Sequence, residues 1–375
     1  MPQILFLTLK TFSLTGGVEK VCRIMAHVLY ELQQKGIFSA SVFSMHDKHS
    51  DVDTAYCPKQ MFTGFAGNKI KAIISTVLTA RTCDILILSH INLLLAARIL
   101  NLFYPKKQVV LIAHGIEIWG NISTGKKRFL NKPNVEIWAV SNYTADRIVQ
   151  KHRVNGSRIK VLNNCLDPFL KIGSDFNKPE YLLKRHGLQP GQPVLFTLTR
   201  LASTEKYKGY DLVIDALAEL RAKYGSAVYI LGGKADAVEA ARLQKLIAEK
   251  NLQEQVKLIG FVKDEELSDY FKLADVFVMP SRKEGFGIVF IEAAASGCKV
   301  IGGNIDGSVD ALLNGTLGLP VNPLDPEEIK QAIETQLNLE RSPEIAARIQ
   351  KASLDSFSYS QYKERVEILL KNHLN

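Results

Sequence analysis

Cysteine is scarce in this sequence, and the five residues present are not arranged for a disulfide framework or a metal site. None belongs to a CxxC pair, no zinc-ligand spacing occurs, and their number is odd in a chain that is not small. We therefore interpret the thiols as reduced, as in a cytoplasmic protein. The cysteines are Cys22, Cys57, Cys83, Cys165 and Cys298.

Long hydrophobic runs are also missing. Residues 1–9 lack a basic stretch and a long apolar core, so we interpret them as a first buried strand and not as a signal peptide. The most apolar stretch, residues 85–100, is interrupted by His90, Asn92 and Arg98. These polar residues favour a strand, a turn and a helix over a membrane span.

Two common ligand motifs are absent. The pair Gly16-Gly17 is not part of G-x-G-x-x-G, so a dinucleotide fingerprint is not supported. The Asp-x-Asp element at residues 51–53 lies in a polar loop that is distant in sequence from the other motifs. We therefore expect neither a metal ion nor another cofactor.

Basic residues outnumber acidic ones, 47 to 38, but the excess of +9 is uneven along the chain. Residues 1–170 hold 21 basic and 10 acidic residues, a balance of +11, whereas the remainder holds 26 and 28, a balance of −2. The N-terminal half should therefore seek an anionic partner such as a membrane surface or a lipid phosphate. A nucleic-acid partner is not expected, because the charge is diffuse and no reading module is recognisable.

Both halves alternate strand-like apolar runs with helical patterns, which predicts parallel sheets with helices on both faces. Two doubly wound α/β domains in tandem are the economical arrangement for 375 residues. The turn-rich stretch 168–190 is the expected boundary. The predicted strands are 4–9, 40–43, 85–88, 109–113, 136–140 and 159–162, followed by 194–199, 227–231, 256–259, 276–279, 299–301 and 318–321.

Two acids, Glu284 and Glu292, flank the turn Gly285-Phe286-Gly287 between an apolar run and a helical pattern. Glycines bring backbone N–H groups close to a ligand, and the helix that follows directs its positive end to the same place. Such a loop suits an anion that carries hydroxyls, with Glu292 accepting from ribose and Glu284 accepting from a sugar. The alternative is a solvated loop acid and an acid on the helix surface.

The wider pattern resembles the signature of retaining GT-B glycosyltransferases of the GT4 type. Its residues are Pro280-Ser281-x-x-Glu284-Gly-Phe-Gly-x-x-x-x-Glu292-Ala-x-x-x-Gly297. The resemblance implies two Rossmann-like domains that face each other across a cleft, with the last helix crossing back to the N-terminal domain. Residues 1–170, with a helix at about 358–375, would bind the acceptor, and residues 171–357 would bind a nucleotide sugar.

Basic residues after the predicted strand 194–199 suit a diphosphate. Arg200 stands at the strand end and Lys208 precedes a glycine at a helix start, which pairs a bidentate guanidinium with a point charge. The alternative is a solvated basic loop, and Lys206 competes with Lys208 for the role. By resemblance, Arg200 and Lys208 stabilise the departing diphosphate in place of a metal ion.

Three further segments extend the expected site. By resemblance, Gly16-Gly17 at a helix start closes over the donor phosphates, His114 after a strand contacts the transferred sugar, and the loop at Val262 offers backbone groups to the nucleobase. An ordinary connection at Gly16-Gly17 and a structural histidine are the alternatives. The catalytic set is His114, Arg200, Lys208 and Glu284, and the donor set is Gly16, Gly17, Arg200, Lys208, Val262, Glu284, Gly285, Phe286, Gly287, Ile288, Val289 and Glu292.

Two basic stretches of the first half suit peripheral contact with an anionic membrane. Residues 69–81 carry one apolar helical face between basic side chains, and residues 125–132 combine basic side chains with two apolar ones. A helix packed on the core and a solvated loop are the alternatives. The apolar face consists of Ile70, Ile73, Ile74, Val77 and Leu78.

The resemblance implies transfer of a hexose, with retention, from a nucleotide sugar to a saccharide or lipid-linked saccharide in polysaccharide or glycoconjugate biosynthesis. UDP-glucose is the first expected donor and GDP-mannose the second, and the expected place is the cytoplasm or the inner face of the membrane. A GT-B-like sugar-nucleotide epimerase would form product from the donor alone. A non-catalytic nucleotide-sugar binder would need neither His114 nor Glu284. Both remain alternatives.

Overall fold

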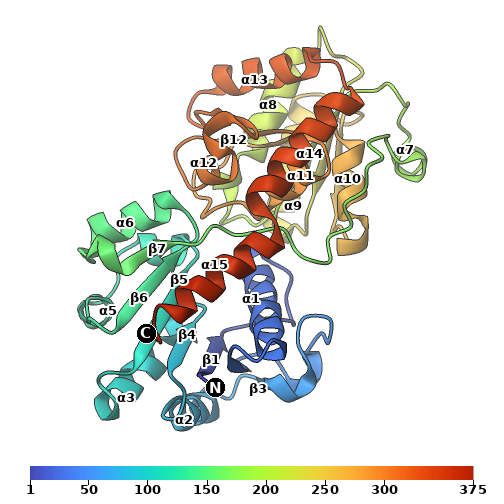
Figure 1. Ribbon diagram of the computed structural model, residues 1–375. Helices are drawn as coiled ribbons and strands as arrows, with labels where there is room; N and C mark the ends of the chain where they lie inside the picture. Colours follow the sequence, from blue (N-terminus) through green and yellow to red (C-terminus); the bar gives the residue numbers. More distant parts are fainter. Residues whose placement is uncertain (375) are drawn as a thin grey trace. The chain divides into compact units, whose positions relative to one another are not determined.

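The computed structural model describes residues 1–374, which form two compact units (Figure 1). The first unit comprises Met1–Pro168 and the C-terminal segment that begins at Tyr359, and the second comprises Phe169–Ser358. Each unit contains one parallel sheet with helices between its strands, which confirms the predicted α/β class.

The sheet of the first unit has seven strands in the order β3-β2-β1-β4-β5-β6-β7. The chain runs from β1 outward in one direction and then returns to the other side of β1, so the order reverses between β1 and β4. The strands are β1 (Gln3–Thr8), β2 (Ser39–Ser44), β3 (Phe62–Gly64), β4 (Ile85–Leu88), β5 (Gln108–Ala113), β6 (Val135–Ala139) and β7 (Ile159–Val161). The helices are α1 (Gly17–Gln34), α2 (Lys69–Ala80), α3 (Leu94–Phe103), α4 (Ile116–Trp119), α5 (Thr124–Leu130), α6 (Asn142–His152) and α15 (Tyr359–Lys371).

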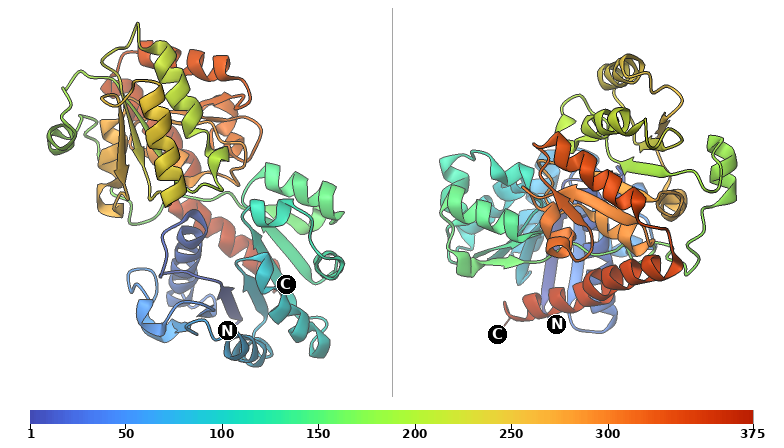
Figure 2. Two further views of the ribbon diagram at one scale, coloured as in Figure 1. Left: turned by 180° about the vertical axis from the view of Figure 1, so that it is seen from behind. Right: turned by 90° about the horizontal axis from the view of Figure 1, so that it is seen from above.

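The sheet of the second unit has six strands in the order β10-β9-β8-β11-β12-β13, and it reverses between β8 and β11. Helices α11 and α14 cover one face of this sheet, whereas α8 and α9 cover the other, as the two opposite views show (Figures 1 and 2). The strands are β8 (Val194–Leu198), β9 (Val228–Gly232), β10 (Val256–Gly260), β11 (Val276–Met279), β12 (Lys299–Gly303) and β13 (Leu319–Val321). The helices are α7 (Glu180–His186), α8 (Tyr210–Leu220), α9 (Ala237–Glu249), α10 (Leu267–Leu273), α11 (Ile288–Ala295), α12 (Ser308–Ala311), α13 (Pro326–Asn338) and α14 (Pro343–Phe357).

The twelve strands predicted from apolar runs all occur, with ends that agree to within one or two residues. Strand β3, which pairs with β2 at the edge of its sheet, was not predicted. It has three residues, which is too few to show the alternation by which a strand is recognised.

The last helix, α15, packs against α1 within the first unit, as the resemblance implies. The carboxylate of Glu31 on α1 accepts from the hydroxyl of Tyr359 at 2.7 Å and from Lys363 Nζ at 2.9 Å. Burial would raise the pKa of Glu31, but these two partners hold it below its usual value. The C-terminal helix is therefore fixed to the N-terminal unit by apolar packing and by a charged hydrogen-bond pair.

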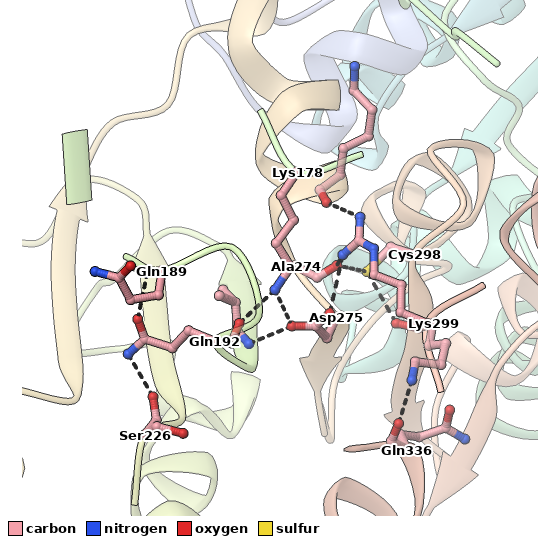
Figure 3. Close-up of polar contacts among 12 residues, drawn as sticks. Lys178, Gln189, Gln192, Ser226, Ala274, Asp275, Cys298, Lys299 and Gln336 are labelled. Carbon is pink, nitrogen blue, oxygen red and sulfur yellow. Dashed lines mark hydrogen bonds and ion pairs between the residues drawn. The ribbon is translucent and has the colours of Figure 1, made fainter. Parts of the chain in front are cut away.

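A polar network lies at the amino ends of the strands of the second sheet (Figure 3). The carboxylate of Asp275, directly before β11, accepts from Lys178 Nζ at 2.6 Å, from the N–H of Val194 at 2.7 Å and from Arg341 at 3.2 Å. Burial lowers the pKa of Lys178 despite this ion pair. The network ties the segment before β8 to the sheet.

All five cysteines are free thiols buried inside their units. Among residues 1–374, none of the helices combines the length and the apolar character that a membrane crossing requires.

Candidate active site

Strands β8 and β11, between which the order of the second sheet reverses, are direct neighbours. In open α/β sheets, ligands bind outside the carboxyl ends of the strands at such a reversal, because the following connections leave on opposite sides and open a crevice. Arg200 and Lys208 follow β8, and Glu284 follows β11. The fold thus brings three predicted site residues to one edge of one sheet.

Two contacts hold the loop after β8 against the loop after β11. The N–H of Arg282 donates to the carbonyl of Tyr207 at 2.9 Å. Gly209 has a φ of +79°, and a Cβ at this position would lie 2.4 Å from the carbonyl oxygen of Pro280. Glycine alone fits this approach. The glycine after Lys208 therefore brings the two loops together.

Lys208 and Glu284 form an ion pair between Nζ and Oε2, and both side chains are largely buried. Burial would lower the pKa of Lys208, but the charge of Glu284 raises it above its ordinary value. Lys208 is therefore a cation at neutral pH. A diphosphate could replace Glu284 as its partner, and this exchange would free the carboxylate to accept from a sugar hydroxyl.

Arg200 differs from Lys208 because its side chain is 69% exposed, with one guanidinium nitrogen 3.3 Å from Glu205 Oε1. Lys206 is also exposed. Burial raises the pKa of the Tyr207 hydroxyl, and the charges of Lys208, Glu205, Glu284 and Arg200 also act on it. Lys208 therefore provides a fixed charge, whereas Arg200 can move toward an anion.

The turn Gly285-Phe286-Gly287 leads from this ion pair into α11. Gly287 has a φ of +89° and precedes the first residue of the helix, which no side chain caps. The ring of Phe286 is buried and contacts Phe357 edge to face, with ring centroids 5.6 Å apart. Phe286 thus anchors the turn, while the first N–H groups of the helix, at Ile288 and Val289, are the kind that bind a phosphate.

Glu292 and Val262 are both buried, whereas a surface acid and a surface loop residue would be exposed. Glu292 lies on α11 and is only 2% exposed, so the alternative of an acid on the helix surface is wrong. Val262 follows β10 and is also buried, with its Cγ2 3.1 Å from the position of a Cβ on Gly232. Any contact of Val262 with a base therefore falls to its backbone, whereas the side chain of the neighbouring Phe261 is exposed.

Asp306 was not predicted as a site residue, yet it supports the loop that carries Glu284. Its Oδ2 accepts from the N–H of Glu284 at 2.6 Å, and its Oδ1 accepts from the N–H of Ser308 at 2.9 Å. The carbonyl of Glu284 in turn accepts from the N–H of Gly307 at 2.8 Å. Burial raises the pKa of Asp306 to about 6, despite these hydrogen bonds.

In the first unit, Gly16-Gly17 opens α1 at the carboxyl end of β1, one of the two strands at which that sheet reverses. The preceding loop is held by Asp47, which the sequence analysis did not identify. Its carboxylate accepts from the N–H groups of Thr11 at 2.7 Å and Ser13 at 3.1 Å, and from the hydroxyl of Ser44 at 2.7 Å. Burial would raise the pKa of Asp47, but these hydrogen bonds hold it below the usual range.

His114 follows β5, and its ring is fixed in one orientation. Nε2 lies 2.8 Å from the carbonyl oxygen of Ser89, and because a carbonyl only accepts, Nε2 carries the proton. The N–H of His114 donates to Glu117 Oε1 at 2.6 Å. Burial lowers the pKa of the imidazole to about 4, and Glu19 of α1 lies within electrostatic range. The ring is therefore neutral at neutral pH, with Nδ1 as an acceptor.

Within residues 1–374, no group of three or more histidine, cysteine or acidic side chains is arranged to hold a metal ion. The charged groups that converge on the carboxyl edge of the second sheet are instead Arg200, Lys208 and Glu284. A site built from cations and a helix start, beside an acid, suits an anionic ligand with hydroxyl groups.

Comparison with known proteins agrees with this arrangement. The family described as glycosyl transferases group 1 matches residues 180–354. A GDP-mannose-dependent α-(1-6)-phosphatidylinositol monomannoside mannosyltransferase of Mycolicibacterium smegmatis is 29% identical over 238 residues, which are 60% of either chain. An α-D-kanosaminyltransferase of Streptomyces kanamyceticus is 28% identical over 196 residues, 52% of this chain and 48% of that protein. The chain thus spans about half to three fifths of the length of these curated relatives.

The crystal structure of Anabaena Alr3699/HepE in complex with UDP is similar over the whole chain. It has a TM-score of 0.81 at 22% sequence identity, and the match covers 99% of this chain and 100% of that one. The fold is therefore GT-B, as the sequence predicts. Residues 180–354 match the glycosyl transferases group 1 family, the GT4 type that the signature around Glu284 resembles.

Proposed function

We propose that this protein is a retaining, metal-independent glycosyltransferase that moves a hexose from a nucleotide sugar to an acceptor hydroxyl. The observation that carries the proposal is the convergence of Arg200, Lys208 and Glu284 beside the uncapped start of α11. A nucleotide sugar needs both an anion site and hydroxyl acceptors, and this edge of the sheet offers the two together.

Each of these residues has a role in the proposed reaction. As the bond between the sugar and the diphosphate breaks, negative charge grows on the phosphate oxygens. Lys208, Arg200 and the first N–H groups of α11 stabilise that charge, which is the main way such a site accelerates transfer. Glu284 accepts from the sugar hydroxyls, Glu292 binds ribose and the backbone beside Val262 contacts the base.

We assign acceptor binding to the first unit. His114 is neutral, with its proton on Nε2, so Nδ1 can accept a hydrogen bond from a hydroxyl of the transferred sugar. The N–H groups of the glycines that open α1 are our proposed further contact for the donor phosphates. Because no carboxylate stands out as a nucleophile, retention fits a reaction in which the acceptor hydroxyl attacks the anomeric carbon from the same face that the diphosphate leaves. A phosphate oxygen of the leaving group takes the proton of the acceptor hydroxyl.

UDP-glucose is the first donor to test and GDP-mannose the second. The Anabaena HepE protein has been crystallised in complex with UDP-glucose, and the mycobacterial relative is a GDP-mannose-dependent enzyme. The relative acts on a phosphatidylinositol mannoside. This supports a saccharide or lipid-linked saccharide as the acceptor, to which the basic first unit would be suited.

A thermal-shift panel without metal tests the donor site. UDP, GDP, ADP, UDP-glucose, UDP-GlcNAc and GDP-mannose would be compared on the wild type, on Arg200→Ala with Lys208→Ala, and on the matched control Lys206→Ala. We expect one nucleotide to raise the melting temperature of the wild type and the control but not that of the double variant. If a folded wild type responded to none of them, the donor assignment would be abandoned.

Incubation with the responding donor separates transfer from its rivals. Release of the nucleoside diphosphate that increases when a saccharide acceptor is added supports the transferase. A new sugar formed from the donor alone, without an acceptor, would favour an epimerase. Binding without any turnover across an acceptor panel would favour a non-catalytic nucleotide-sugar binder.

A further inference from the structure

The outward side of α2 in the first unit is apolar, which is the reverse of an ordinary surface helix. Its large side chains Ile70, Ile74 and Leu78 are exposed, with Ile70 at 74%. The residues that α2 buries are the small ones, Ala72, Thr76 and Ala80. The alternative of a core-packed helix thus holds for one side of α2, where Val77 packs against the core and Ile73 is half-buried, but not for the exposed side chains. A surface helix normally buries its large apolar side chains because they gain most from leaving water.

The neighbouring helix α3 continues this apolar surface. It packs against α2, and its exposed large side chains are Leu95 and, at its C-terminal end, Leu102 and Phe103, at 78% and 69%. Single exposed apolar residues are common on proteins, but six on two helices in contact make a patch, and such patches mark interaction sites. We call these residues the α2–α3 face: Ile70, Ile74, Leu78, Leu95, Leu102 and Phe103.

Basic residues are concentrated in the part of the chain that carries the α2–α3 face. Residues 65–132 contain ten lysines and arginines but only two acids, Asp84 and Glu117, so this region holds a large part of the positive charge of the first unit. Glu117 is engaged by the N–H of His114. The basic residues are Lys69, Lys71, Arg81, Arg98, Lys106, Lys107, Lys126, Lys127, Arg128 and Lys132.

Contacts place the basic helix α5 beside α3. The guanidinium of Arg98 lies 3.4 Å from the position of a Cβ on Gly125, and Lys126 Nζ donates to Asn92 Oδ1 at 3.1 Å. A shallow groove beyond the end of α3 adds aromatic and basic groups, among them Tyr104 and Lys106. The charge is therefore not spread at random but borders the apolar side chains.

We infer that the α2–α3 face binds the surface of an anionic lipid bilayer. Apolar side chains enter the boundary between headgroups and acyl chains, while the surrounding lysines and arginines contact lipid phosphates. Tyr104 and Phe103 suit the interface, where an aromatic ring can rest among the headgroups. The inference does not depend on the proposed transfer reaction, because it uses no residue of the donor site.

Charge complementarity favours a bilayer over the other occupants of an apolar face. A second copy of this chain, joined by a two-fold axis, would bring the same basic border against itself. A nucleic acid would match the charge but would leave Ile70, Ile74 and Leu102 against phosphates and water, because these side chains have no partner there. An anionic bilayer offers both an apolar interior for the exposed apolar side chains and negatively charged headgroups for the basic ones.

Vesicle sedimentation of the full chain, without nucleotide, tests the inference. Vesicles of phosphatidylcholine mixed with phosphatidylglycerol are compared with phosphatidylcholine alone, at low and at high salt. We expect binding only to the anionic vesicles, weakened by salt. Replacing Ile70, Ile74 and Leu78 by serine should weaken it by roughly tenfold or more. Replacing Lys69, Lys71 and Arg81 by glutamine should weaken it by roughly a hundredfold, at about fivefold for each charge.

Matched controls come from the second unit, where exposed residues of the same kind stand outside the α2–α3 face. Val238, Leu324 and Leu339 are replaced by serine, and Lys184, Lys245 and Lys351 by glutamine. These variants should bind as the wild type does, and all variants should keep its melting temperature. Equal binding by the face variants and the controls, or no binding by the wild type, would overturn the inference. The inference would also be overturned if the wild type formed a dimer that the serine variant of the face disrupted and the other variants did not.

Discussion

The backbone N–H of Glu284 donates to Asp306 Oδ2 at 2.6 Å, so the loop that carries one proposed sugar contact rests on a buried acid that follows β12. Both oxygens of Asp306 accept from backbone N–H groups, since Ser308 occupies Oδ1. The carboxylate is thus buried, and hydrogen bonds from backbone N–H groups do not offset the loss of water, which explains why its pKa remains raised to about 6.

Replacing Asp306 by asparagine should flatten the pH dependence of stability. Because the folded pKa of about 6 exceeds the ordinary 3.8, the folded state keeps a proton that the unfolded state loses between these values. Stability should therefore fall as pH rises from about 4 to about 6, by at most roughly 3 kcal/mol. Urea unfolding of the wild type, of Asp306→Asn and of the exposed control Asp264→Asn measures this slope, and an equal slope in all three would contradict the assignment.

The Lys208–Glu284 pair should couple in a double-mutant cycle. Lys208→Met or Glu284→Gln alone leaves a largely buried group without its charged partner, and each should lower the free energy of unfolding by roughly 1–3 kcal/mol. The double variant should lose less than the sum of the two. The exposed pair Lys351–Asp355 serves as the control and should show little coupling. If the losses for Lys208→Met and Glu284→Gln were simply additive, the ion pair would contribute nothing to the free energy of unfolding.

Kinetics of a Lys208 variant separate the catalytic role of this lysine from its structural role. Lys208→Ala should lower kcat by roughly 10²–10³-fold with the responding donor, because one group that stabilises the departing diphosphate is lost. Lys206→Ala, two residues away and exposed, should keep kcat. A loss confined to KM, or the same loss in both variants, would remove Lys208 from the reaction.

His114 should remain neutral over the working pH range. Its folded pKa of about 4 lies below the ordinary 6.5, so the group adds stability above about pH 6.5 and loses it as pH falls toward 4. Nitrogen-15 NMR of the imidazole should show a protonated Nε2, an unprotonated Nδ1 and no titration above about pH 5. A ring that titrates near 6.5 would place His114 in solvent and contradict the hydrogen bond to Ser89.

Asp47→Asn should loosen the loop before α1. Three N–H groups and two hydroxyls donate to this carboxylate, whereas the exposed Asp146 on α6 is a suitable control. We expect a loss of about 2–3 kcal/mol in the free energy of unfolding near pH 7, which shrinks as pH falls through the low folded pKa. If Asp47→Asn were as stable as Asp146→Asn, the loop would not depend on this residue.

The periodicity of apolar residues predicted the strands, and the Gly-Phe-Gly signature predicted the loop after β11, because both patterns are local in sequence. Asp306 and Asp47 could not be assigned a role for the opposite reason. Their partners are backbone N–H groups up to 36 positions away, which carry no residue-type signal. Helix α2 shows a third limit of prediction from sequence. Its pattern predicted an apolar stripe that contains Ile70 and Ile74, but it could not predict which side of the helix faces the sheet.

The contact of α15 with α1 has a consequence for how the chain is made. The ribosome releases Glu31 long before Tyr359 and Lys363, which donate to its carboxylate and follow it by 328 and 332 positions. The second unit, whose residues are continuous, can fold before α15 is made, whereas the first unit is complete only once α15 has emerged. During that interval the apolar surface of α1 that later receives α15 is exposed to chaperones and proteases.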